Sequence, residues 1–136
     1  MVLLYTTDKA HALVINTNKM TVFYGKDMAI LEGRVEVRQE GAILQANKAT
    51  IKYSKDTKGV EQIEAVGNVS IKNEDIDASG DTAIYSHKTT TVELRGRVVV
   101  NSKDGKIHGE VLTYNLHSKK AIIDGGVEGV RLRIYD

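Results

Sequence analysis

The residue types that most often perform chemistry are sparse in this chain. Histidines stand at positions 11, 87, 108 and 117, there is no cysteine to join them, and none of them has the close spacing of paired metal ligands. His87 and His117 fall in polar segments that we expect to be turns. We therefore expect these histidines to be solvated surface residues, and we favour this interpretation over metal ligands or catalytic bases.

Carboxylates and glycines do not form a reactive site either. Asp75 and Asp77 flank Ile76, and Asp81 follows Gly80, whereas a calcium site needs more oxygen ligands within one loop. The recurrent Gly-x-Val triplets do not open a helix, as phosphate-binding glycine loops do. We therefore expect no nucleophile, no acid–base pair, no metal, no cofactor and no enzymatic activity.

The composition limits the kinds of partner. The 136 residues include 19 basic and 18 acidic residues, interleaved along the chain, for a net charge of +1. Nucleic acid is not an expected partner, because its binding domains usually carry a basic stripe. Cysteine and proline are absent, so disulfides cannot form and strand pairing is not interrupted. The length predicts a single domain over 1–136.

The N-terminal residues are apolar only briefly. The run Met1-Val-Leu-Leu-Tyr5 is too short for the apolar region of a signal peptide, although Ala10-His-Ala12 has the small-x-small form of a signal-peptidase site. A chance match and a remnant of a leader both stay open. We expect residues 1–12 to be a leader remnant or a flexible N-terminal segment.

Two recurring marks divide the chain into four copies of one unit, at steps of 29 to 34 residues. The first mark is an aliphatic residue, a spacer and a tyrosine, and its tyrosines are Tyr24, Tyr53, Tyr85 and Tyr114. The second mark is a glycine two residues before a valine, and its glycines are Gly33, Gly67, Gly96 and Gly125. Such a period is typical of stacked supersecondary units, which build a long continuous surface.

Apolar residues alternate with polar ones around each of these glycines. Val92 and Leu94, for example, alternate with Glu93 and Arg95. A period of two with many β-branched residues predicts half-buried strands. No segment has the spacing of an amphipathic helix, so we expect almost no helix.

The second strand of each unit carries a break in this alternation. Leu44 and Ala46 are even-numbered and Ala49 is odd-numbered, and equivalent breaks fall beside Gly80 and Gly109. A one-residue slip turns every side chain to the opposite face, so three equivalent breaks indicate a bulge or corner. We expect an all-β fold, with repeated antiparallel strands that form two curved facing sheets around an aliphatic interior groove, a β-jellyroll.

The pattern of the units resembles the OstA-like family of lipopolysaccharide-transport proteins. Leu44-Gln-Ala-Asn-Lys-Ala49 is similar to the family's aliphatic-x-Ala-Asp-x-Ala segment, and Gly67-Asn68-Val69 matches its Gly-Asn-Val triplet. Gly33-Arg-Val35 and Gly96-Arg-Val98 differ from the triplet at the middle residue. The resemblance extends over residues 13–130.

This resemblance implies a function in outer-membrane biogenesis of a Gram-negative cell. Within the family, the chain most resembles the soluble bridge component of the periplasm. That resemblance implies lipopolysaccharide as cargo, with its lipid A acyl chains shielded in the groove. It also implies an inner-membrane LptC-like protein at the N-terminal edge, an outer-membrane LptD-like protein at the C-terminal edge, and head-to-tail homo-oligomers.

The apolar faces of the predicted strands supply candidates for the lining of such a groove. Burial of an acyl chain gains about 0.8 kcal/mol per methylene, and an aliphatic surface holds a chain without fixing its position. The candidate lipid-binding residues are Leu13, Ile15, Leu31, Val35, Val69, Ile71, Tyr85, Val98 and Tyr114. For each of them, packing in a dry core stays open as an alternative. The tyrosines also have two interpretations, as amphipathic strand residues or as lipid contacts.

The two ends of the chain predict edges that other proteins can use. The segment Val130-Arg-Leu-Arg-Ile-Tyr135 alternates strictly, so we expect an edge strand with Val130, Leu132 and Ile134 as partner-binding residues. We expect the same of Leu13-Val-Ile15 at the other end. Arg131 and Arg133 are alternatively gatekeepers that prevent such pairing, and this choice stays open.

Two other functions compete with a lipid-carrying bridge. One is a self-assembling structural β-repeat scaffold without lipid cargo. The other is the soluble domain of a sibling component of the same transport pathway.

Overall fold

The computed structural model describes residues 2–4, 13–57 and 59–135, which fold almost entirely into β-strands. The strands are β1 (Val2–Leu4), β2 (Leu13–Asn16), β3 (Lys19–Phe23), β4 (Met28–Gln39), β5 (Ala42–Tyr53), β6 (Val60–Lys72), β7 (Asp77–Ser86), β8 (Thr91–Ser102), β9 (Gly105–Asn115), β10 (Ala121–Asp124) and β11 (Arg131–Ile134). Within these ranges the helical content is confined to the short 3-10 turns η2 (Tyr24–Lys26) and η3 (Gly126–Glu128), which confirms the expectation of almost no helix.

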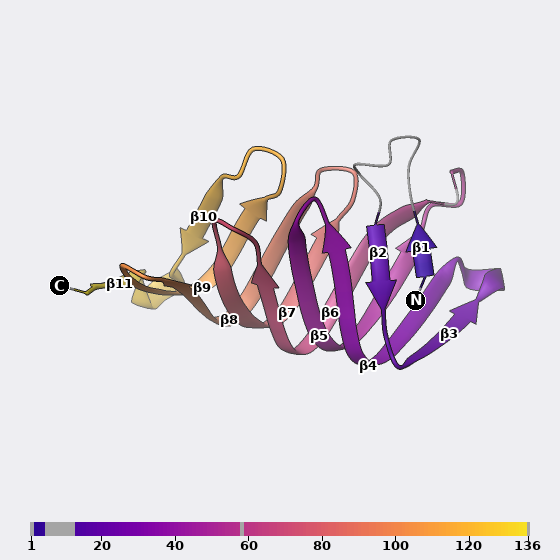
Figure 1. Cartoon of the computed structure of the whole chain (residues 1–136), viewed down its shortest axis with the longest axis horizontal. Helices are drawn as coiled ribbons and strands as arrows, with labels where there is room; N and C mark the ends of the chain where they lie inside the picture. Colours follow the sequence, from indigo (N-terminus) through magenta and orange to yellow (C-terminus); the bar gives the residue numbers. More distant parts are fainter. Residues whose placement is uncertain (1, 5–12, 58, 136) are drawn as a thin grey trace.

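The eleven strands of the described residues form one antiparallel sheet, in the order β1-β2-β4-β5-β6-β7-β8-β9-β10. β3 pairs with the first half of β4, and β11 pairs with the first half of β9. β2 and β3 thus share β4, just as β10 and β11 share β9. Because the long strands β4 to β9 pair in chain order, the sequence repeat becomes a linear stack with the two ends of the chain at opposite ends (Figure 1).

A β-bulge interrupts each long strand near its middle. Gly33 and Arg34 of β4 oppose the single residue Asn47 of β5. The same two-against-one arrangement recurs between β6 and β7 and between β8 and β9. The extra residue lies on the glycine-bearing strand. On the paired strand, the buried positions switch between even and odd numbers at the bulge. The sequence break beside Ala46, Gly80 and Gly109 therefore marks a real corner, and that prediction is confirmed.

The corners depend on two successive residues in the left-handed conformation. Gly33, Gly67 and Gly96 have φ of 82°, 84° and 82°. The residues that follow them, Arg34, Asn68 and Arg97, have φ of 48°, 48° and 47°. Asparagine adopts this region more readily than most residues, which accounts for its place in the Gly-Asn-Val triplet.

The bulges fold the sheet into two facing halves. Half-sheet A consists of β1, β2, β11 and residues 35–39, 42–46, 69–72, 77–80, 98–102 and 105–109. Half-sheet B consists of β3, β10 and residues 28–32, 48–53, 60–66, 82–86, 91–95 and 111–115. The strands bend from one half to the other along the side opposite the hairpin turns (Figure 1). The buried apolar residues form one cluster between the halves.

The fold is the predicted all-β jellyroll, and its interior is aliphatic as expected. Val2–Leu4, inside the segment expected to be a leader remnant or flexible, pairs with β2 as β1, and residues 5–12 lie outside the described ranges. Among the residues described, no helix has the length and apolar character needed to cross a bilayer.

Candidate functional site

Cross-strand neighbours on the inner face form apolar rows that run from one end of the sheet to the other. In half-sheet A one row comprises Ile15, Val37, Leu44, Ile71, Ala78, Val100, Ile107 and Leu132. In half-sheet B the corresponding row comprises Val22, Ala29, Ile51, Ile63, Tyr85, Val92, Tyr114 and Ala121. Neither row contains a charged side chain, so the interior offers a continuous hydrocarbon surface along the stack.

The nine candidate lining residues all lie in this interior. They come from β2, β4, β6, β7, β8 and β9, and none of them is more than 2% exposed. They pack against one another and against the other inner residues as one core. The interior is therefore packed, and lipid contact at these nine positions stays a prediction.

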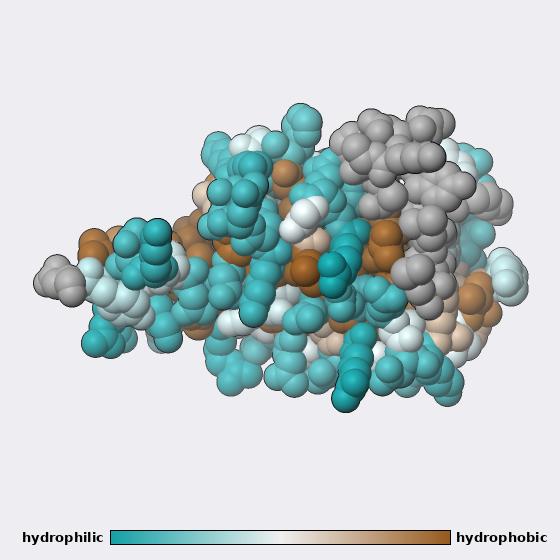
Figure 2. All heavy atoms as spheres, in the orientation of Figure 1, coloured by the Kyte–Doolittle hydropathy of each residue, from teal (hydrophilic) through white to brown (hydrophobic). Residues whose placement is uncertain are grey.

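The two half-sheets meet along a seam, which we define as the line where their hairpin turns face each other. Half-sheet A contributes the turns after Gln39 and Lys72, and half-sheet B contributes those after Ser86 and Asn115. Figure 2 shows hydrophobic atoms along this line, between hydrophilic side chains of the turns. The seam is the side on which the interior lies nearest to solvent.

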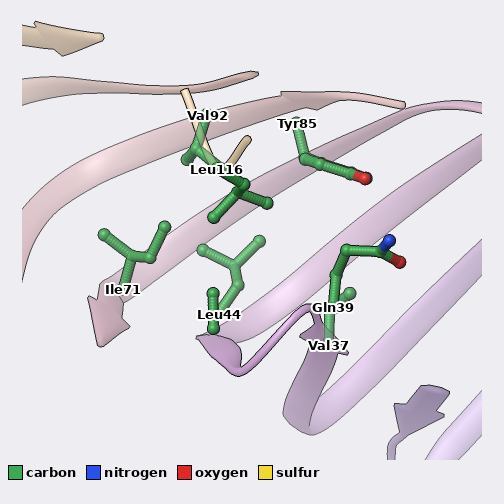
Figure 3. Close-up of a pocket in the computed structure, with 8 residues that line it drawn as sticks. Val37, Gln39, Leu44, Ile71, Tyr85, Val92 and Leu116 are labelled. Atoms are coloured by element: carbon green, nitrogen blue, oxygen red, sulfur yellow. The ribbon is translucent and has the colours of Figure 1, made fainter. Parts of the chain in front are cut away.

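A small apolar cavity lies under the seam. Half-sheet A contributes Val37, Gln39, Ala42, Leu44 and Ile71, and half-sheet B contributes Tyr85, Val92 and Leu116. The cavity has room for about one water molecule. Figure 3 shows the aliphatic side chains of the two halves facing each other, with the Tyr85 hydroxyl and the Gln39 amide on the same side of the cavity.

Of these eight residues, Ile71 and Tyr85 belong to the predicted lining. The other six were missed because the sequence prediction favoured positions beside the glycines, whereas the cavity lies at the turn ends of the strands. An inner-facing residue within three positions of a turn is the signal that would have found Gln39, Ala42 and Leu44.

The four repeated tyrosines are not equivalent in the structure. Tyr24 is 88% exposed, whereas Tyr85 and Tyr114 are each 2% exposed. Burial raises the pKa of Tyr85 far above its ordinary value, and the charge of Glu40 adds to this shift. Burial and the neighbouring Tyr24 raise the pKa of Tyr53 to a smaller degree. The four tyrosines occupy the same place in the repeated unit, so their burial depends on where the unit lies along the stack.

The hydroxyls of the two buried tyrosines make different contacts. The Tyr85 hydroxyl lies 2.8 Å from Nδ1 of His87, which is two residues further on in the same half-sheet. The Tyr114 hydroxyl accepts a hydrogen bond of 2.9 Å from Nδ2 of Asn73. Because Asn73 lies in the turn that half-sheet A contributes after Lys72, this second bond crosses the seam.

An ion-pair cluster crosses the seam beside that hydrogen bond. Nζ of Lys119 lies 3.5 Å from a carboxylate oxygen of Asp75 and 3.6 Å from one of Glu74. The charges of Asp75 and Glu74 raise the pKa of Lys119 above its ordinary value. The two turns that supply these residues are thus joined by polar contacts.

The C-terminal end of the stack exposes its apolar residues. Val130, Leu132 and Ile134 are 48%, 59% and 68% exposed, and β11 pairs with β9. Figure 2 shows hydrophobic atoms at this end of the molecule. The C-terminal segment is an edge strand within the described residues, as predicted, while its role in partner binding stays a prediction.

The edge prediction for Leu13–Ile15 is wrong. β2 pairs with β4 on one side and with β1 on the other, and both Leu13 and Ile15 are buried. The short apolar run at residues 2–4 covers this strand, so the N-terminal end presents β1 in half-sheet A and β3 in half-sheet B.

The polar residues considered for chemistry lie apart or have structural partners. In the described ranges no three histidine, aspartate or glutamate side chains are placed to hold a metal ion. His108 lies on β9 and His117 in the turn that follows, while His11 lies outside the described residues. Oδ1 of Asp81 lies 2.8 Å from a guanidinium nitrogen of Arg97.

Comparison with known proteins identifies similar chains. A family profile described as LptA/(LptD N-terminal domain) LPS transport protein matches residues 14–120. Among solved structures, the fold is similar to LptH from Pseudomonas aeruginosa, described as the LptA homologous periplasmic component of the lipopolysaccharide transport device. The TM-score is 0.77 at 18% identity, and the match covers 96% of this chain and 100% of LptH. A search of curated proteins finds no match.

Proposed function

The chain belongs to the family of LptA and the LptD N-terminal domain, which are lipopolysaccharide-transport proteins and not enzymes, and on this basis we propose that it is a periplasmic bridge for lipopolysaccharide. Its interior shields the acyl chains between the two half-sheets. The sugars and phosphates stay outside, along the seam.

The continuous apolar rows carry this proposal. A soluble domain needs a buried core, but it does not need apolar rows that extend to exposed residues at both ends. The row in half-sheet A ends at Leu132, which is 59% exposed, and the row in half-sheet B begins at Val22, which is 38% exposed. A chain that moves along these rows exchanges one aliphatic contact for another, so successive positions are nearly equal in free energy.

The packed interior does not prevent such a role. When the half-sheets part, the inner side chains lose contacts with each other and gain contacts with acyl chains of similar polarity. Each buried methylene contributes about 0.8 kcal/mol relative to water, which offsets the cost of separating the halves. The seam is the side on which they can part, because the corners join them on the other side.

Photo-crosslinking in cells tests the proposal. A photoreactive residue at Val69 or Tyr85, which point inward, should form an adduct with lipopolysaccharide. Matched probes at Ser70 and Ile84, their outward-facing neighbours, should not. If inner and outer probes behave alike, the interior does not carry the lipid.

A self-assembling scaffold without cargo is the second candidate, and the small size of the seam cavity favours it. The same crosslinking experiment separates the two functions, because a scaffold yields no lipid adduct at Val69. A sibling domain of the same pathway is a third candidate. The complete reading frame distinguishes it, since a spanning helix upstream of residue 1 would replace the bridge by a membrane-anchored component.

We further propose that the ends of the stack bind partners by strand addition, with an LptC-like protein at the N-terminal end, an LptD-like protein at the C-terminal end and a second copy as an alternative. The exposed residues Val130, Leu132 and Ile134 support this role at the C-terminal end. Leu132→Asp should abolish co-purification with the LptD-like partner and leave the fold intact by circular dichroism. If the variant still co-purifies with this partner, β11 is not part of the interface.

A further inference from the structure

We propose that Asn73, Tyr114 and Lys119 form a latch across the seam, which must release before an acyl chain can pass from the seam cavity toward the C-terminal end of the interior. The inference rests on the proposed function for its lipid step. The latch itself rests on contacts between the two half-sheets.

The first contact is the hydrogen bond between Asn73 and Tyr114. The amide Nδ2 of Asn73 donates to the Tyr114 hydroxyl at 2.9 Å. The other amide atom, Oδ1, accepts hydrogen bonds of 2.8 Å from the backbone N–H groups of Asp75 and Ile76. These two bonds fix the amide, so that its Nδ2 is already oriented toward the opposite half-sheet.

The facing turn is ordered in the same manner. Oδ1 of Asn115 accepts bonds of 2.8 and 2.9 Å from the backbone N–H groups of His117 and Ser118. The backbone N–H of Lys119 donates to the Asn115 carbonyl at 2.8 Å. Lys119 is thus presented toward Asp75 and Glu74 by a defined turn, and the two halves of the latch are both preorganised.

The latch lies directly beside the seam cavity. Ile71 and Leu116 line the cavity, and each is two residues from a latch residue, Asn73 and Tyr114 respectively. The cavity itself joins the halves through aliphatic contacts, which an acyl chain can replace without loss of directional bonds. The latch contacts are directional and polar, so a hydrocarbon chain cannot replace them. The latch therefore forms the next barrier along the seam after the cavity.

The first experiment measures opening without lipid. The chain contains no cysteine, so spin labels on introduced cysteines report on chosen pairs: Lys72 with His117 beside the latch, and Arg38 with Lys88 at the cavity. All four side chains are exposed. A hydrogen bond and a weak ion pair together raise the ratio of closed to open molecules by roughly tenfold.

In the Tyr114→Phe/Lys119→Gln variant, the Lys72–His117 distances should shift to longer values, with about ten times more of the open form. The Arg38–Lys88 distances should not change. Tyr53→Phe and Lys120→Gln are matched controls, because they remove a partly buried tyrosine hydroxyl and a neighbouring lysine charge outside the latch, and they should behave as the wild type. A latch variant with unchanged Lys72–His117 distances would overturn the latch.

The second experiment tests passage of lipid. Cysteines in place of Glu74 and Lys119 are joined by a short, cleavable thiol crosslinker, and the locked protein receives purified lipopolysaccharide. Photoreactive probes are placed at Val92, which lines the cavity, and at Leu112, an inner residue of β9. We expect the lock to abolish the adduct at Leu112, to retain the adduct at Val92, and to lose its effect after cleavage.

The outcomes separate the two proposals. Equal adducts at Val92 and Leu112 in the locked protein would remove the latch as a barrier and leave the proposed function in place. An absence of adducts at both positions after cleavage would instead argue against lipid carriage itself. In that case the spin-label distances still decide whether the latch holds the half-sheets together.

Discussion

The middle of the stack and its C-terminal end are built from similar sequences and differ in structure. At Gly33, Gly67 and Gly96 the chain crosses between half-sheets through a two-residue bulge with both residues left-handed. At the fourth mark, β10 ends at Asp124 and β11 begins at Arg131, with η3 between them. The fourth corner is therefore a loop, and β10 and β11 are separate short strands.

The surroundings of the glycines differ between the regular corners and the fourth mark. Each regular glycine leaves room for a polar side chain. Asn47 of β5 lies beside Gly67, Asp81 of β7 lies beside Gly96, and Asn18, between β2 and β3, lies beside Gly33. Gly125, the glycine of the fourth mark, instead has φ of −93°, and a Cβ there would clash with the backbone of Gly129. The left-handed residue is the next one, Gly126, which has nothing closer than 3.8 Å to the position of a Cβ, and its nearest neighbour is Glu110. In this last unit Val127 is fully exposed.

The largest expected effect is at a regular corner. Gly67→Ala places a methyl group at φ 84°, with its Cβ only 2.8 Å from Nδ2 of Asn47, so we expect a loss of about 3 kcal/mol in the free energy of unfolding. Gly126→Ala at φ 62° should cost about 1 kcal/mol, because only backbone strain is added. Urea denaturation measures both. Equal losses would contradict the distinction between the corners.

A second substitution should detach the C-terminal edge alone. A Cβ at Gly105 would clash with the carbonyl oxygen of Arg133, whereas a Cβ at Gly80 stays 3.4 Å from the nearest backbone atom, the Arg95 carbonyl oxygen. Gly105→Ala should release β11 and cost about 2 kcal/mol of local stability. Hydrogen exchange should show lost protection at Arg131–Ile134 with strands β5 to β7 unchanged. Gly80→Ala, the control, should keep β11 protected.

Alkaline pH should expose the difference between buried and exposed tyrosines. Because the folded pKa of Tyr85 is raised above the ordinary 10.0, its stabilising contribution is complete below pH 10 and is lost as the pH rises, since the unfolded chain releases the proton first. The expected loss is about 1 kcal/mol at pH 11. Denaturation of Tyr85→Phe should lack this loss, whereas Tyr24→Phe should retain it. If the stability of Tyr85→Phe falls with pH as steeply as that of the wild type, the loss comes from another group.

The smallest expected effect concerns the second residue of the corner. Arg34 has φ of 48°, and asparagine adopts this conformation at lower cost, so Arg34→Asn should stabilise the fold by about 0.5 kcal/mol. Asn68→Arg, the reverse change at the equivalent position of the next corner, should destabilise the fold by a similar amount. Thermal and urea unfolding of both variants provide the measurement, and a shift of the same sign in both would contradict the explanation.

The strands and corners could be predicted from the sequence because they follow from local alternation. The break between Ala46 and Ala49 is visible in the sequence alone, since each corner changes the parity of the strand that pairs with the glycine-bearing one. The burial of Tyr24 and Tyr85 could not be predicted, because it depends on which strands flank a unit. The pairing of Val2–Leu4 with β2 and the bond between Asn73 and Tyr114 join residues that no repeat relates, so periodicity gives no signal for them.

The stagger across the seam has a consequence for the shape of the ends. The turn between β6 and β7 meets the turn between β9 and β10 through Asn73 and Tyr114, so along the seam the facing turns of the two layers are offset by three strands. A layered body with such an offset ends in steps and not in flat faces. A molecule that continues the interior must therefore overlap this one at the interface. Where one of the two molecules has only one half-sheet, the other molecule supplies the facing half-sheet.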